Sequence, residues 1–165
     1  MMINRDYPCN PSNYANQADR TVEYIVIHYV GATGSARENA LYFQRSAGLQ
    51  ASAHFFVGHK SEGGAIYQSV DPKDRAWHCG AKTYKHPDCR NANSIGIEMC
   101  CHKDSQGNWY FDDITIARTA QLTEMLMDAY DIPLSNVLRH YDVTGKLCPA
   151  PMVDEFAWLL FKQRL

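Results

Sequence analysis

The chain has 165 residues, of which 45% are hydrophobic and 21% are charged, and these proportions are typical of a globular domain rather than a disordered chain. Sixteen basic and 18 acidic residues give a net charge of −2, which argues against a nucleic-acid partner, because nucleic-acid-binding domains usually carry a basic excess. The longest uninterrupted hydrophobic run, residues 156–161, is far shorter than the roughly 20 residues that span a bilayer, so no membrane-spanning helix is predicted. The length predicts one domain over residues 1–165.

The N-terminal segment and the cysteines bear on the cellular compartment. Residues 1–20 are polar and lack the basic start, hydrophobic middle and cleavage site of a secretory signal, so we expect synthesis in a cytoplasm or export by another route. Six cysteines stand at positions 9, 79, 89, 100, 101 and 148. Without a signal they favour reduced thiols over a disulfide framework, although one bridge between Cys79 and Cys89 stays open.

The first half of the chain predicts strands around one helix. Residues 22–30 (VEYIVIHYV) are β-branched and aromatic, which is typical of a buried strand. Ser35 to Glu38 fit a capping box that starts a helix, and Gly48 is the expected stop. Residues 53–57 and 65–70 are strand-like runs on either side of a Ser-Glu-Gly-Gly turn, which predicts a hairpin.

The second half begins with a long loop over residues 71–93, and loops of this length are more often functional than accidental. Residues 94–100 again have strand character. Thr115 is the expected cap of a long helix that ends before Pro133. The residues predicted to share one face of this helix are Leu122, Met125, Leu126 and Ala129.

Residues 137–151 are expected to be irregular, and a last helix over 153–162 is expected to place three hydrophobic side chains together. These side chains are Phe156, Leu159 and Leu160. Strands that alternate with helices predict one α/β domain with a central mixed sheet flanked by helices and a core from about residue 22 to residue 162.

Two histidines and one cysteine form the first candidate site. His28 lies near the end of an otherwise hydrophobic strand, where a lone histidine is more often a core residue than a ligand. His140 and Cys148 lie eight positions apart in a flexible segment that can fold both onto one ion. Two imidazoles and a thiolate are typical of catalytic zinc, with the fourth position left for water. The spacing alone is a weak signal, and Cys148 as a buried, inert thiol stays open.

Five short motifs occur in order along the chain. They are IVIHYV around His28, SAHFFVG from Ser52, AWHCG from Ala76, NSIGIE ending at Glu98 and RHYDVTGKLCPAP from Arg139. Together they resemble the zinc-dependent N-acetylmuramoyl-L-alanine amidases, the family that includes the phage lysozyme-type amidases and the peptidoglycan recognition proteins. The likeness covers nearly the whole chain. Its last motif is most similar to phage or prophage endolysins of clostridia-like hosts.

The resemblance implies a catalytic role for five residues. His28, His140 and Cys148 match the ligands of one zinc ion; some relatives carry aspartate at the third position. Glu98 matches a glutamate that acts as general base and then carries the proton to the leaving amine. Lys146 matches a lysine that stabilises the developing oxyanion. Outside the family pattern, Glu98 reads as a solvent-facing strand carboxylate and Lys146 as an ordinary surface lysine.

One departure concerns a tyrosine that several relatives carry before the His-Phe of the second motif. Ala53 stands there in this chain and has no proton to donate, so the mechanism depends on Glu98. Further residues are expected to line the site or contact substrate. These residues are His54, Trp77, His78, Tyr84 and Asn93. Trp77 with His78 has an alternative role as an anchor of the loop, and His54 has an alternative structural role.

The function that the resemblance implies is hydrolysis of the amide between N-acetylmuramic acid and L-alanine in bacterial peptidoglycan, as in endolysins and autolysins. The alternative is a peptidoglycan-binding module of the same fold without turnover, and the presence of Cys148, Lys146 and Glu98 favours the enzyme. A structural zinc domain would require a fourth protein ligand, which the motifs do not supply. The sequence contains no GxSxG motif, the nucleophile elbow of many serine hydrolases, so a serine hydrolase is disfavoured.

Peptidoglycan or muropeptides are the expected partners, and one Zn²⁺ is the expected cofactor. Neither nucleic acid nor a membrane is expected as a partner, and a monomer is expected. A phage-type enzyme collects in the cytoplasm and reaches the wall when the membrane is breached. Endolysins often carry a separate wall-binding domain, and one that follows this catalytic domain is a further hypothesis.

Overall fold

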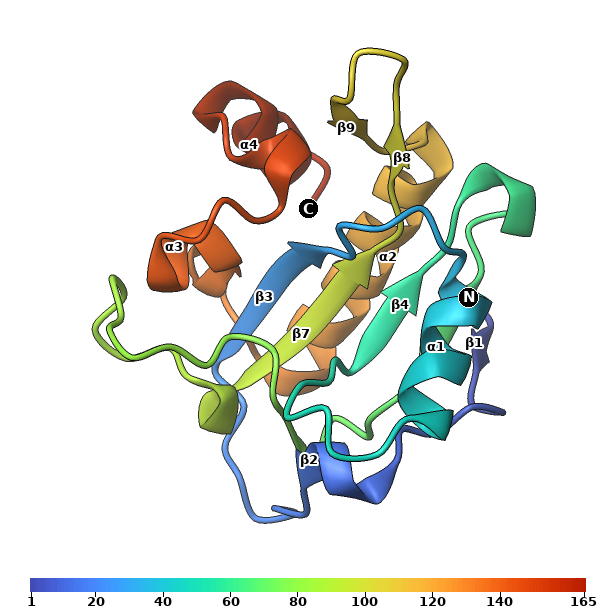
Figure 1. The fold of residues 1–165 in the computed structure, drawn as a ribbon. Helices are drawn as coiled ribbons and strands as arrows, with labels where there is room; N and C mark the ends of the chain where they lie inside the picture. Colours follow the sequence, from blue (N-terminus) through green and yellow to red (C-terminus); the bar gives the residue numbers. More distant parts are fainter.

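The computed structural model describes residues 1–165. A six-stranded mixed sheet forms the centre of the fold (Figure 1). From edge to edge the strands are β1 (Ile3–Asn4), β5 (Ile66–Gln68), β4 (Phe55–Val57), β7 (Ser94–Met99), β3 (Tyr24–Tyr29) and β10 (Val137–Arg139). Neighbours are parallel except β4 and β5, which form the predicted antiparallel hairpin. The predicted α/β domain with a mixed sheet is confirmed.

The two central strands, β3 and β7, separate a hydrophobic face from a face that carries polar groups. Side chains alternate along a strand, so Ile25 and Ile27 point into a core of 17 buried residues while Val26 and His28 point to the opposite face. In the parallel register His28 lies opposite Glu98, so both side chains project from the same face. The sheet therefore brings one imidazole and one carboxylate side by side.

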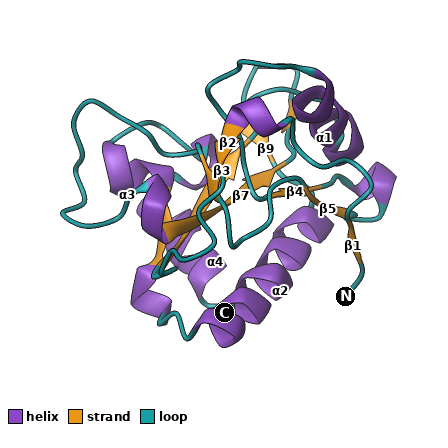
Figure 2. Ribbon diagram, turned by 90° about the horizontal axis from the view of Figure 1, so that it is seen from below, coloured by secondary structure: helices purple, strands orange, loops and turns teal.

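Helices cover both faces of the sheet, as Figure 2 shows. In chain order they are α1 (Ala36–Arg45), α2 (Asp113–Tyr130), α3 (His140–Thr144) and α4 (Glu155–Lys162). Helices α2 and α4 pack on the face with the large core, through Leu122 and Leu126 from one and Trp158 and Phe161 from the other. Helices α1 and α3 lie on the second face, which leaves that face open between them for a site. None of the helices combines the length and hydrophobicity that crossing a membrane requires.

Helix α1 begins as predicted but ends earlier. The Ser35 side chain accepts a hydrogen bond from the Glu38 amide, and the Glu38 carboxylate accepts one from the Ser35 amide, which completes the capping box. The helix ends at Arg45, and Ser46 follows in extended conformation, so Gly48 does not stop the helix as predicted. Gly48 has a φ of +69° in the loop beyond.

Helix α2 presents a different face from the one that its hydrophobic residues predict. Its N-cap is Asp112, and Thr115 lies inside the helix, fully buried, where its hydroxyl donates to the Gly58 carbonyl (2.8 Å). Thr119 and Thr123 are also buried because their hydroxyls donate to the carbonyls four residues earlier (2.8 and 2.7 Å). Because their hydroxyl groups have hydrogen-bond partners, the three threonines occupy the buried face of the helix. Met125 and Ala129 were predicted on that face and are exposed.

The last helix also buries other residues than predicted. Asp154 caps α4 by accepting a hydrogen bond from the Ala157 amide (3.1 Å), and Trp158 and Phe161 are buried. Phe156, Leu159 and Leu160 do not form the buried face; Phe156 is 70% exposed. The two aromatic rings stack at a centroid distance of 5.4 Å and fill the space beside the sheet.

The short elements were not predicted. Residues 137–151, expected to be irregular, contain β10 and α3, and the long loop contains one strand of a small second sheet. The small sheets pair β2 (Tyr14–Ala15) with β6 (Arg75–Ala76) and β8 (His102–Lys103) with β9 (Trp109–Tyr110). Runs of two or three residues are too short to show a hydrophobic period, so only tertiary packing identifies them.

All six cysteines are buried free thiols, as the reduced reading expected, and Cys79 and Cys89 are not bridged. Cys100 and Cys101 are both fully buried, although neighbouring residues of a strand point to opposite faces. The reason is that β7 ends at Met99, so the alternation no longer applies to them.

Candidate metal centre

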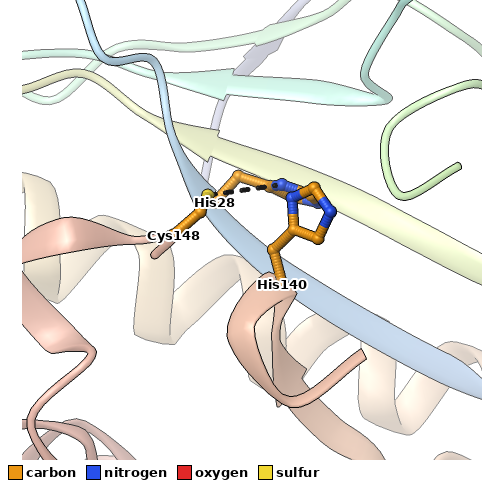
Figure 3. Close-up of side chains that lie close together, drawn as sticks. All are labelled: His28, His140 and Cys148. Atoms are coloured by element: carbon orange, nitrogen blue, oxygen red, sulfur yellow. Dashed lines mark hydrogen bonds between the residues drawn. The ribbon is translucent and has the colours of Figure 1, made fainter. Parts of the chain in front are cut away.

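Three side chains from distant parts of the sequence meet on the second face of the sheet (Figure 3). His28 lies near the end of β3, His140 is the first residue of α3, and Cys148 lies in the loop after α3. Strands β3 and β10 are parallel neighbours, so the chain leaves β10 at the same edge at which β3 ends. The topology therefore places the segment 140–148 beside His28.

The segment is held in place by Arg139, a buried residue at the end of β10. Its guanidinium donates two hydrogen bonds to Asp142 (3.0 and 2.7 Å), one to Glu155 (2.9 Å) and one to the Val153 carbonyl (2.8 Å). These bonds tie α3 to the start of α4. The Tyr141 amide donates to the Cys148 carbonyl (2.8 Å), which closes the loop back on α3. Both ligand candidates of this segment are thus anchored by the backbone.

The geometry of the cluster suits a single ion. One potential ligand atom from each of His28, His140 and Cys148 lies within 4.8 Å of the others. The Nδ1 atom of His28 is 3.7 Å from the Cys148 Sγ, and the two imidazole rings lie 4.7 Å apart between centroids. The residues are only 1%, 5% and 3% exposed, respectively. A group of this kind could hold a metal ion.

One polar atom in the cluster has no partner in the protein. The Nδ1 atom of His140 is buried and makes no hydrogen bond, although buried polar atoms in proteins are nearly always paired. Metal coordination would satisfy this lone pair. The donor set of two imidazoles and one thiol fits a borderline-soft divalent ion such as zinc.

The electrostatics of the three residues follow from burial. Burial, with the neighbouring His78 second, holds the pKa of His28 well below its usual value, and burial followed by the Lys146 charge lowers the pKa of His140 to about 4. Both imidazoles are therefore neutral near pH 7, which is the form that binds metal. Burial, and then the Glu98 charge, raises the pKa of Cys148 to about 12, so the thiol must lose its proton to bind an ion.

Glu98 and Lys146 lie beside this cluster. The Oε1 atom of Glu98 is 4.0 Å from the His28 Nδ1, and its Oε2 is buried without a hydrogen-bond partner. Burial raises the pKa of Glu98 to about 8, and the positive charge of Lys146 opposes that rise. Lys146 is exposed at the mouth of the site. A carboxyl whose pKa lies near neutrality can both accept and donate a proton at physiological pH.

A cavity of about 930 Å³ opens next to the cluster. Its lining includes His140, Lys146, Trp77 and His78. The volume is in the range of a site for a ligand larger than a single sugar or amino acid. His140 is the member of the cluster that lines this cavity.

The structure separates the residues predicted to contact a substrate. Trp77 and His78 line the cavity, whereas His54, Tyr84 and Asn93 do not. His54 is completely buried beneath the site, where its Nε2 bonds to the Asp74 carbonyl (3.1 Å) and its Nδ1 accepts from the Gly96 amide (2.9 Å). The ring of His54 is thus held inside the protein, and its contact with substrate stays a prediction.

Tyr84 and Asn93 support the long loop instead. The Arg90 guanidinium lies 3.8 Å above the centre of the Tyr84 ring, and the Tyr84 hydroxyl accepts from the Ala81 amide (3.2 Å). The Asn93 side chain donates to Glu23 (3.0 Å) and to the Asp88 carbonyl (3.2 Å). Their polar groups hold the loop, and their contact with substrate stays a prediction.

Sequence reasoning missed other residues of the cavity lining, among them Lys82, Asn91 and Thr144. Asn91 accepts hydrogen bonds from the amides of His78 (3.1 Å) and Cys79 (2.8 Å), so it also shapes the loop that carries His78. For Lys82 and Asn91 the only signal was the length of the loop, which does not tell which of its side chains point inward; Thr144 lies in α3, within the last sequence motif.

The fold and the cluster together define a class: single α/β domains with a mixed sheet and a His-His-Cys metal centre beside an open cavity. The sequence profile of the Amidase_2 family, described as N-acetylmuramoyl-L-alanine amidase, matches residues 18–151, and the chain belongs to this family. The expected family resemblance is thereby confirmed.

Individual relatives agree with this assignment. The chain is 31% identical over 152 residues to N-acetylmuramoyl-L-alanine amidase CwlL of Bacillus licheniformis, with 84% of this chain and 39% of the relative covered. It is 34% identical over 147 residues to BlyA of Bacillus subtilis (strain 168), with 81% and 38% covered. The catalytic domain of XlyA superimposes with a TM-score of 0.78 at 27% identity and 99% coverage of both chains. The chain thus spans about two fifths of the first two relatives but a whole catalytic domain.

Proposed function

We propose that the chain is a zinc-dependent N-acetylmuramoyl-L-alanine amidase, which hydrolyses the amide between N-acetylmuramic acid and L-alanine in bacterial peptidoglycan. The observation that carries the proposal is the convergence of His28, His140 and Cys148 within 4.8 Å at the side of a 930 Å³ cavity. The family supplies the substrate class, and the site supplies the groups that hydrolysis requires.

His28, His140 and Cys148 would hold the zinc ion through two ring nitrogens and one sulfur. Three protein ligands, rather than four, leave a coordination position open, as catalytic zinc sites do. Zinc in such a site supplies Lewis acidity, which acidifies water and polarises a carbonyl. The partnerless Nδ1 of His140 supports this assignment because coordination accounts for it.

Glu98 is proposed as the group that moves the proton. Hydrolysis forms a bond between a water oxygen and the carbonyl carbon, breaks the carbon–nitrogen bond and transfers one proton to the departing amine of L-alanine. The Glu98 carboxylate accepts the proton from water and then donates it to that nitrogen. Its position 4.0 Å from the His28 Nδ1 and its pKa of about 8 support both steps.

Lys146 and the aromatic wall of the cavity are proposed to act on the substrate. The Lys146 ammonium stabilises the negative charge that develops on the carbonyl oxygen when water adds. Trp77 offers a flat hydrophobic surface to a sugar ring or a peptide side chain, and it lines the same cavity as Lys146. Lys82 adds a second positive charge to the lining, which favours a substrate with carboxylates.

The test is a digestion of purified peptidoglycan by the zinc-loaded protein, with and without a chelator, followed by mass spectrometry. Glycan strands free of peptide, together with peptides that begin with unblocked L-alanine, are expected. Chelation should abolish the products and added zinc should restore them. Peptidoglycan that stays intact while it retains the protein would contradict the proposal and indicate a binding module.

The cellular setting is part of the same proposal. A chain with this activity acts on the bacterial cell wall, which agrees with the relatives named as amidases. The monomeric state, the lack of a membrane or nucleic-acid partner, and an additional wall-binding domain stay predictions from the sequence.

A further inference from the structure

Three alternate residues of β7 lie on the face of the sheet that carries the ligand candidates. Ser94, Gly96 and Glu98 are two positions apart, so their side chains project from the same face of the sheet. Glu98 lies beside His28, as described above. Ser94 and Gly96 both contact the ring of His78, which the long loop brings over the strand. The strand therefore supports a histidine that is not itself in the ligand group.

The ring of His78 is bonded through both nitrogens. Its Nδ1 lies 3.0 Å from the Nε2 of His28, and its Nε2 lies 3.1 Å from the Ser94 hydroxyl oxygen. The Ser94 hydroxyl donates to the Arg90 carbonyl (2.7 Å). The rings of His28 and His78 are perpendicular, with centroids 5.1 Å apart, which is the arrangement of an edge-on hydrogen bond rather than a stack.

The Arg90 carbonyl, at one end of this chain of hydrogen bonds, determines the direction in which each bond is donated. A carbonyl oxygen only accepts, so the Ser94 proton points to Arg90 and the Ser94 oxygen accepts the N–H at the Nε2 of His78. With its one ring proton on Nε2, His78 offers Nδ1 as an acceptor for the N–H at the Nε2 of His28. This leaves the Nδ1 of His28 without a proton, and Nδ1 is the atom that lies 3.7 Å from the Cys148 Sγ.

Gly96 shows that the strand is adapted to the ring. A Cβ at this position would lie 2.5–2.8 Å from three atoms of the His78 imidazole, which real contacts do not allow. Glycine weakens a strand because it has no side chain to pack, yet it stands here in the middle of the sheet. The backbone amide of His78 also donates a hydrogen bond to the side-chain oxygen of Asn91 (3.1 Å). Ring and backbone are thus both fixed.

We propose that His78 is a positioning residue, which selects the tautomer and orientation of His28 so that its Nδ1 faces the metal. The inference rests on the proposed zinc site. Groups that orient a metal-bound histidine typically change metal affinity or activity about 10- to 100-fold when they are removed. His78 therefore acts on zinc through His28, and its place in the cavity wall is secondary.

The test compares two variants of His78 by zinc affinity, measured in competition with a chromophoric chelator. His78→Leu fills similar space but cannot accept a hydrogen bond, and its affinity should fall about 10- to 100-fold. His78→Asn keeps an oxygen near the position of Nδ1, so it should recover most of the affinity. Equal affinities of His78→Leu and the wild type would overturn the inference.

A role in substrate binding alone gives a different pattern. His78→Leu would then raise KM while zinc affinity stayed at the wild-type value, and that result also contradicts the proposal. A wild-type protein that binds no zinc would remove the proposed function itself and the inference with it. The two failures are therefore told apart by the wild-type titration.

A second measurement does not depend on whether His78→Leu folds. Nitrogen-15 NMR of the histidine rings in the zinc-free wild type should show the proton of His28 on Nε2 and that of His78 on Nε2. Ser94→Ala removes the acceptor at the end of the chain and should disturb this pattern, while Ser94→Thr should keep it. A His28 ring with its proton on Nδ1 in the wild type would overturn the inference.

Discussion

Glu98 is the residue whose chemistry depends most on its surroundings. It projects from a hydrophobic strand, its Oε2 is buried without a partner, and burial raises its pKa to about 8. A carboxyl placed in this way is costly to keep charged, so the fold would gain from its removal unless function required it. This argues for a chemical role at this position.

We expect Glu98→Gln to lower the rate of peptidoglycan hydrolysis about 10²- to 10⁴-fold, because the amide keeps the shape but cannot carry a proton. Zinc content should stay at the wild-type level, since Glu98 is not among the ligand group. Release of peptide amino groups measures the rate, and atomic absorption measures the zinc. The matched control is Glu124→Gln on the exposed side of α2. A rate close to that of the wild type would show that another group moves the proton.

At the scale of elements, the clamp formed by Arg139 joins three parts of the structure. It ends β10, caps α3 through Asp142 and reaches the start of α4 through Glu155 and the Val153 carbonyl. The planar guanidinium supplies five donors from three nitrogens in a fixed fork, whereas a lysine ammonium has three donors on a single nitrogen. The metal-binding segment depends on this clamp because His140 is the next residue.

Arg139→Lys should therefore destabilise the protein by about 1.5–3 kcal/mol, the contribution of hydrogen bonds to a charged group. Zinc affinity should fall as well, because the start of α3 loses its anchor. Urea unfolding followed by circular dichroism gives the stability. Arg164→Lys, at an exposed position of the same C-terminal region, serves as the control. Equal unfolding midpoints for Arg139→Lys and the wild type would contradict this account of the clamp.

A second element-scale feature is the carboxylate that precedes α2. The Oδ2 atom of Asp112 accepts hydrogen bonds from the Lys60 amide (2.7 Å) and the His102 Nε2 (3.0 Å), so it joins the helix start to the hairpin β8–β9. The Lys60 amide is the main cause that holds the pKa of Asp112 below its usual value. A lowered folded-state pKa contributes stability above the unfolded value of about 3.9 and loses it as the pH falls through the folded-state pKa.

Asp112→Asn should accordingly lower the free energy of unfolding by about 1 kcal/mol near neutral pH, since a neutral amide is the weaker acceptor. Between neutral pH and pH 3 the variant should lose less stability than the wild type does. Urea midpoints at the two pH values measure both effects. Asp113→Asn, exposed in the first turn of the same helix, is the comparison. An unchanged dependence on pH in Asp112→Asn would refute the linkage.

The sequence and the structure agree best where a pattern is long and purely hydrophobic. The strands around His28 and Glu98, the hairpin and the capping box of α1 follow from alternation and local hydrogen bonding. The buried face of α2 did not, because three threonines satisfy their hydroxyls within the helix or against a carbonyl and so replace hydrophobic residues. Hydrophobicity alone cannot show which polar residues find partners.

The residues of the candidate site also differ in how well the sequence predicts their positions. His28, His140 and Cys148 were expected from motifs, and the structure brings them together. The structure places His54, Tyr84 and Asn93 outside the cavity lining, because their surroundings depend on how the long loop folds back, which no local pattern specifies. His78 was expected to face substrate, and only the coordinates place its ring between His28 and Ser94.

At the scale of the whole molecule, the metal centre and the main core lie on opposite faces of the sheet. The 17-residue core joins β3, β4 and β7 to α2 and α4 and includes none of the three ligand candidates. The core therefore does not depend on the ion for its packing. This distinguishes the domain from small zinc folds that unfold without metal.

Removal of zinc by a chelator should leave the far-ultraviolet circular dichroism nearly unchanged but lower Tm. Binding at a free zinc concentration about 1,000 times Kd stabilises the folded state by about 4 kcal/mol, and chelation removes this contribution. Thermal unfolding with and without chelator measures the difference. Unfolding of the domain by the chelator alone at room temperature would show that the site, rather than the core, holds the fold together.

The distance between the candidate ligands along the sequence also determines how long a ribosome needs to synthesise the complete set. His28 and Cys148 are 120 positions apart, and a ribosome that adds about 5–20 residues per second needs about 6–24 s to pass from one to the other. Until the cysteine has emerged, the nascent chain has only part of its ligand set. A fragment whose translation stops before Cys148 therefore lacks one of the three residues of the cluster.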